Sequence, residues 1–126
     1  MKLAHALASV AFACALGTMA EAACLYPQAP QNIPNGATAA KDDMLAAQAT
    51  VKEYSQAVQN TYLPCLEQEK NSSIAALTPN DPDYDKKKKT LESIHAKKHN
   101  AAMDELQATA KRWGEEIAAF KKREAE

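Results

Sequence analysis

The chain has 126 residues, of which 46% are hydrophobic, and its formal net charge is −1. This length excludes a second domain and a thick core, and the balanced charge excludes nucleic-acid binding through a basic surface. After residue 22 only 14 residues are Leu, Ile, Val or Phe. We therefore expect a thin core that contains many alanines.

Residues 1–22 are predicted to be a signal peptide. Lys2 gives a positive start, an uncharged apolar run follows over 3–19, and Ala20-Glu21-Ala22 has the small residues of a cleavage site. We place the cut after Ala22, which predicts a periplasmic protein with no stable membrane insertion. A retained anchor is one alternative, although the run is shorter than the ~20 residues of a spanning helix. A lipoprotein modified on Cys24 is another, although Glu21 is unfavourable for it.

The cysteines fit export. Cys14 leaves with the leader, so Cys24 and Cys65 remain as an even pair in an oxidising compartment. We expect them to form a structural disulfide, and two free buried thiols are the alternative.

Residues 23–37 are predicted to form an extended arm. Pro27, Pro30 and Pro34 exclude a helix and favour a polyproline-like conformation, and Asn35-Gly36 is a turn signal. An extended arm spans about 43 Å from Cys24 to Thr38 at 3.1 Å per residue, and a helix from Thr38 to Cys65 spans about 40 Å. With the disulfide formed, the arm must run back along the helix, so that Leu25, Tyr26 and Ile33 cover it.

The first helix is predicted over 38–77, with Thr38 as its N-cap and a kink near Pro64. Its apolar stripe follows helical spacing close to a heptad seam. The stripe consists of Met44, Ala47, Val51, Tyr54, Val58, Tyr62 and Cys65.

The second helix is predicted over 82–123. Asp81 is its expected cap and Pro82 its expected first residue, while Gly114 weakens its interior unless packing compensates. Its stripe consists of Leu91, Ile94, Ala102, Leu106, Ala110, Trp113, Ile117 and Phe120.

The predicted fold is therefore all-α. A short connection makes two helices of similar length antiparallel neighbours, so residues 38–126 should form a long two-helix hairpin. The Pro-rich arm, 23–37, would be stapled to it by a Cys24–Cys65 disulfide.

His95 and His99 are the candidate metal ligands. They are four residues apart, so both rings project from one face of the helix and suit Cu²⁺ or Zn²⁺. Lys97 and Lys98 oppose a cation there, and the alternative is that the histidines pack against the seam or face solvent. We expect no resident cofactor.

Two further groups of residues have ordinary structural explanations. An exposed recognition patch or a core stripe is predicted for Trp113, Ile117 and Phe120. A binding site for an anionic partner or a solvated helix face is predicted for Lys86-Lys87-Lys88-Lys89. No motif for a nucleophile, a phosphate loop or a zinc protease occurs. We therefore expect no catalytic residues and no enzyme.

The sequence resembles a small family of exported proteins of Gram-negative bacteria. The resemblance is carried by Cys24-x-x-Pro27, Ile33-Pro34-x-Gly36, Val51-Lys52-x-Tyr54, Tyr62-Leu63-x-Cys65-Leu66 and His99-Asn100-Ala101-Ala102-Met103-Asp104. It implies an export route and a paired-cysteine pattern, and it implies no activity. His95 lies outside the shared pattern.

These observations favour a non-enzymatic periplasmic protein that binds another protein or an envelope component, or that self-associates through an uncovered apolar stripe. Metal binding by His95 and His99 is the first alternative. A periplasmic enzyme inhibitor, which inserts the arm or the hairpin tip into a target cleft, is the second.

Overall fold

The computed structural model describes residues 23–126. The predicted signal peptide, 1–22, lies outside the described residues. The elements in chain order are α1 (Lys41–Ala57), a π-helical segment η1 (Val58–Tyr62), α2 (Leu63–Ala75) and α3 (Tyr84–Glu124). Residues 23–126 contain no strand, so the all-α prediction is confirmed.

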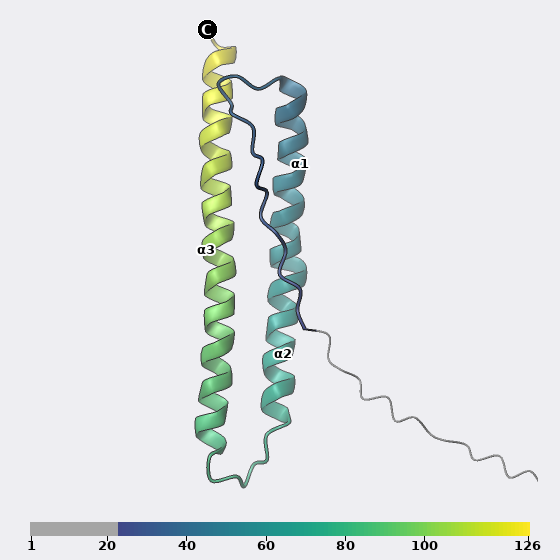
Figure 1. Cartoon of the computed structure of the whole chain (residues 1–126), viewed down its shortest axis with the longest axis vertical. Coiled ribbons are helices and arrows are strands. Elements are labelled where there is room, and N and C mark those ends of the chain that lie inside the picture. The colour runs from purple at the N-terminus through teal and green to yellow at the C-terminus, as the bar shows by residue number, and fades with distance from the viewer. Residues whose placement is uncertain (1–22) are drawn as a thin grey trace, which may run out of the picture.

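The elements form two rods that lie side by side and run in opposite directions (Figure 1). The first three elements follow one another without a break and make one rod, and α3 makes the other. At 1.5 Å per residue, the 41 residues of α3 extend over about 60 Å. The end at which α1 begins and α3 ends is called the open end below.

The core is one side chain thick along the interface between the rods. It consists of Tyr54, Val58, Tyr62 and Leu66 from the first rod and Ala102 and Leu106 from α3. The first rod follows the predicted stripe closely, although Val51 and Cys65 are only half-buried, and Leu66, which we expect to widen the stripe, is fully buried. Met44 and Ala47 extend the buried row toward the open end.

The π-helical segment ends directly before Leu63 and Pro64. Pro64 has no N–H, and its ring would collide with the carbonyl group four residues earlier in an α-helix. The N–H of Leu63 bonds to the carbonyl oxygen of Val58, five residues back, and this wider turn makes room for the ring. Tyr54, Val58 and Tyr62 all remain in the core across this change.

Both predicted helix starts are wrong by two or three residues. Asn35 accepts the N–H groups of Ala37, Thr38 and Ala39, so these residues form a turn and α1 begins at Lys41 with Ala40 as its N-cap. Thr38 is therefore not a cap.

At the other start, the Asp81 carboxylate accepts the N–H of Asp83 at 2.8 Å and pairs with Lys87. Asp83 is the N-cap of α3, so Pro82 precedes the helix. The helix ends also differ slightly from prediction, at Ala75 and Glu124.

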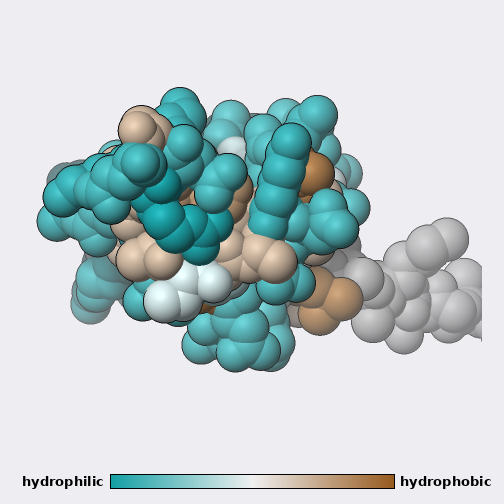
Figure 2. Space-filling model, turned by 90° about the horizontal axis from the view of Figure 1, so that it is seen from above, coloured by the Kyte–Doolittle hydropathy of each residue, from teal (hydrophilic) through white to brown (hydrophobic). Residues whose placement is uncertain are grey.

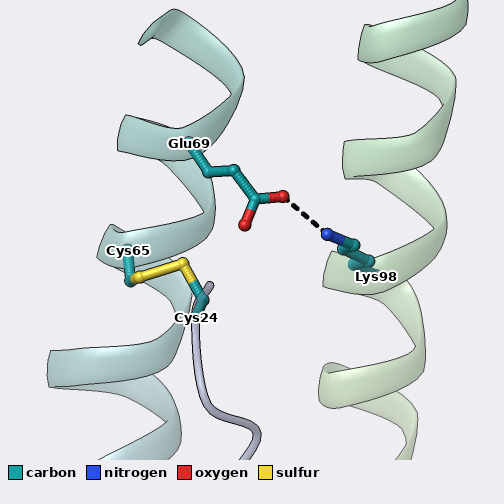
Figure 3. The surroundings of a disulfide bond; sticks show 4 residues. All are labelled: Cys24, Cys65, Glu69 and Lys98. Carbon is teal, nitrogen blue, oxygen red and sulfur yellow. Dashed lines mark hydrogen bonds and ion pairs between the residues drawn. A yellow bond between two sulfur atoms is a disulfide. The ribbon is translucent and has the colours of Figure 1, made fainter. Parts of the chain in front are cut away.

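The arm, residues 23–37, lies along the two rods and has no helix or strand (Figure 1). Cys24 is bonded to Cys65, with 5.8 Å between their Cα atoms, which confirms the predicted disulfide. Figure 3 shows this bond beside the ion pair of Glu69 and Lys98, which joins α2 to α3 at 2.5 Å.

Three contacts hold the arm against α3. The hydroxyl of Tyr26 donates to Glu105, Arg112 donates to the carbonyl oxygen of Gln31, and the N–H of Gly36 donates to Glu116. Leu25 is 90% exposed, so its predicted packing against the helix is wrong. Successive side chains of an extended segment point to opposite sides, and Cys24 and Tyr26 are the neighbours that face inward.

Candidate functional site

An apolar groove lies between α1 and α3 at the open end. Its volume is about 290 Å³. The lining residues are Lys41, Met44, Leu45 and Gln48 from α1 and Trp113, Ile117, Phe120 and Lys121 from α3. Figure 2 looks down on this end, where hydrophilic side chains cover most of the surface and apolar surface is visible between them.

The side chains of the groove are partly accessible. Met44 is 6% exposed and forms part of the floor, whereas Leu45 is 53% exposed. Trp113, Ile117 and Phe120 are half-buried. The sequence offered a core stripe and an exposed recognition patch as interpretations of these three residues. The structure combines the two, because the residues pack toward the seam and also present apolar surface to solvent.

The arm does not contribute to this groove. On α3 the arm contacts Glu105, Arg112 and Glu116, whereas the groove uses Trp113 and Ile117. Adjacent residues of a helix are displaced by about 100° around its axis. The arm thus covers one side of the α1–α3 interface, and the groove opens on the other side.

The two charged residues that line the groove are Lys41 and Lys121. Within residues 23–126 neither of them has an ion-pair partner. Asp43, which is close to Lys41 in sequence, lines a separate pocket under the arm instead. The groove therefore combines an apolar floor with a positive rim.

The predicted metal ligands lie between α2 and α3, far along the rods from this groove. The ring centroids of His95 and His99 are 6.0 Å apart and the rings are tilted by 37°. Nε2 of His95 is buried without a hydrogen bond, although Glu67 Oε2 is 3.3 Å away. Across residues 23–126 no three His, Cys, Asp or Glu side chains lie close enough together to hold a metal ion as a set.

His95 lies closer to the helix interface than the sequence predicts. Its side chain is 17% exposed, whereas Ile94, which was assigned to the seam, is 45% exposed. Ala110 is also exposed and Thr109 is buried in its place. The buried position therefore differs from the predicted one by one residue at both places. It lies one residue later at His95 and one residue earlier at Thr109.

The carboxylate of Glu67 faces His95 from α2. A hydrogen bond from Lys70, at 2.6 Å, is the main reason that the pKa of Glu67 lies below its usual value, and His95 lowers it further. A carboxylate thus lies beside the buried ring nitrogen, and the same carboxylate is paired with Lys70.

The basic run at 86–89 lies in the first turns of α3. Lys86, Lys87 and Lys89 are exposed and Lys88 is half-buried, and Lys87 pairs with Asp81.

Comparison of the chain with protein-family models, with curated proteins and with solved structures gives no match. None of the helices in the part of the chain that the structure describes has the length and apolar character needed to cross a bilayer.

Proposed function

We propose that the protein is a non-enzymatic binding module of the periplasm, built as a helical hairpin with a Pro-rich arm, and that it binds through the groove at the open end. The observation that carries this proposal is the position of the groove. The arm occupies one side of the α1–α3 interface, and on the other side Leu45, Trp113 and Ile117 leave apolar surface accessible. Accessible apolar surface of this kind is typical of interaction sites.

Export is part of the proposal. A disulfide between Cys24 and Cys65 is typical of proteins in an oxidising compartment, and the sequence of 1–22 has the features of a cleaved leader. Mass spectrometry of the protein from a periplasmic extract tests this directly. We expect a chain that begins at Ala23 and gains the mass of two hydrogens on reduction, and an intact leader would contradict it.

The binding role is tested by cross-linking in living cells. A photoreactive amino acid is placed at Leu45, in the groove, and in a matched variant at Glu115, an exposed position on the outer face of α3. We expect adducts from position 45 that are absent from position 115. Equal adducts from both positions, or none from position 45, would contradict the proposed groove.

Transition-metal binding by His95 and His99 is a second candidate function. It is supported by the buried, unbonded Nε2 of His95 and by the 6.0 Å between the two rings. Titration calorimetry with Cu²⁺ and Zn²⁺ tests it on the wild type and on His95→Ala and His99→Ala variants. We expect a saturable site that both substitutions remove, and an affinity that neither substitution changes would end this candidate.

A further inference from the structure

The two lysines of the groove lie at the same end of it. Lys41 is the first residue of α1, and Lys121 lies in the last turn of α3. Because the two rods run in opposite directions (Figure 1), both residues are at the open end, and Gln48 and Trp113 are at the inner end. The groove therefore has a direction, with two lysines at one end and the uncharged side chains of Gln48 and Trp113 at the other.

This arrangement matches a ligand with one charged end and one apolar end. We propose that the groove binds the anion of a free fatty acid, with its carboxylate between Lys41 and Lys121 and its chain lying over Leu45 and Ile117 toward Trp113. The inference rests on the proposed function, since it names the ligand of the same groove.

The size of the groove favours a single chain of medium length. From Lys41 to Gln48 the helix rises by about 10 Å, and the volume is about 290 Å³. The lining is apolar between the two ends, at Met44, Leu45, Ile117 and Phe120. Each methylene that leaves water in such a site tightens binding by about fourfold, so chain length sets the affinity.

The pattern of charge fits an amphipathic helix or a second copy less well. An acidic helix in a groove would place carboxylates along its flanks at successive turns, whereas the lysines lie at one end. A second copy docked by the same face would add two more lysines, and none of the lining residues supplies a carboxylate to pair with them.

Trp113 provides the readout, because it is the one tryptophan of the chain and lies in the groove. The mature, oxidised protein is titrated with laurate below its micelle concentration, and the fluorescence of Trp113 is followed. We expect a saturable blue shift. Dodecanol, which has the same chain without the charge, should bind about tenfold more weakly.

Matched variants separate the head group from the chain. Lys41→Ala and Lys121→Ala should each weaken laurate about threefold, and the double variant about tenfold, and all three should leave dodecanol unchanged. Leu45→Ser should weaken both ligands, and Leu25→Ser, at an exposed position outside the groove, should weaken neither. Circular dichroism of each variant shows that it is folded.

Several results would overturn the inference. Laurate would give no saturable shift, or the wild type would bind laurate and dodecanol equally well. Alternatively, the protein would bind phosphatidylglycerol vesicles but not free laurate, or it would bind an acidic helical peptide in place of laurate. Concentration-dependent dimers that Leu45→Ser abolishes would assign the groove to a second copy. If laurate does not bind but position 45 still gives specific adducts in cells, the proposed function stands and the fatty-acid assignment falls.

Discussion

The N–H of Gly36 donates a hydrogen bond to the carboxylate of Glu116, with 2.7 Å between the nitrogen and Oε2. The turn at the end of the arm is so close to α3 that a Cβ on Gly36 would lie 1.8 Å from the carbonyl oxygen of Glu116. The backbone of Gly36 does not have a positive φ. Close approach, and not an unusual conformation, is therefore what requires glycine at this position.

Gly36→Ala should lower the free energy of unfolding by about 1–3 kcal/mol, because the added methyl group forces the turn away from α3. Urea unfolding followed by circular dichroism measures the change. Ala37→Ser, at the exposed neighbouring position, is the control and should unfold like the wild type. If Gly36→Ala also unfolds at the wild-type midpoint, the arm is not held against α3 in solution.

Gly114→Ala should have the opposite effect and raise the free energy of unfolding by about 1 kcal/mol. Gly114 lies inside α3, and a Cβ there would meet no atom within 4 Å. The sequence led us to expect packing at Gly114 that compensates for its helix cost, and the structure shows open space instead. The same urea measurement applies, and a loss of stability would mean that this face of α3 is covered in solution.

Much of the first rod could be predicted from the sequence, because the apolar residues Met44, Ala47, Tyr54 and Val58 recur at helical spacing along one stripe. In α3 the pattern around Ile94 was ambiguous. Ile94 and His95 are both at a helical spacing from the buried residue Ala102, and hydrophobicity alone selects Ile94. The structure buries His95 instead, with its side chain 17% exposed and its Nε2 3.3 Å from the carboxylate of Glu67 in α2. Such a shift of one residue depends on the neighbouring rod and cannot be predicted from one helix.

The groove was predicted only in part for a similar reason. Trp113, Ile117 and Phe120 stand out in the sequence as an aromatic and aliphatic stripe. The other wall consists of Lys41, Leu45 and their neighbours, about 70 residues earlier in the chain. Their position opposite Trp113 follows from the lengths of the two rods and of the loop at 76–83. The positive end of the groove is therefore a property of the assembled rods.

Replacing both Cys24 and Cys65 by serine should lower the free energy of unfolding by up to about 4 kcal/mol. The disulfide joins residues 41 positions apart, and a loop of this length restricts the unfolded chain by about that amount in the chain-entropy account. Urea unfolding of the double variant measures the loss.

The wild type under reducing conditions is the matched control for the disulfide, since it lacks the bond but keeps both side chains. We expect it to unfold with the double variant. If the reduced protein were as stable as the oxidised one, the arm would not need its covalent link, and the contacts of Tyr26 and Gly36 would be sufficient.

Tyr26→Phe should lower the free energy of unfolding by about 1 kcal/mol near neutral pH, because it removes the hydrogen bond to Glu105. The ring is retained, and it packs edge-on against Tyr62 with 4.9 Å between centroids. Burial raises the pKa of the Tyr26 hydroxyl well above its usual value, and the carboxylate of Glu105 and the neighbouring Tyr54 raise it further.

Because the folded state raises this pKa, the stabilisation from Tyr26 is fully present below the pKa of the unfolded chain, about 10. It decreases as the pH rises from there toward the higher pKa of the folded protein. The difference in unfolding free energy between the wild type and Tyr26→Phe should therefore become smaller above about pH 10. Tyr84→Phe, at the start of α3 and away from the arm, is the control. A difference that stays constant up to the alkaline unfolding transition would show that the Tyr26 hydroxyl is not held by Glu105.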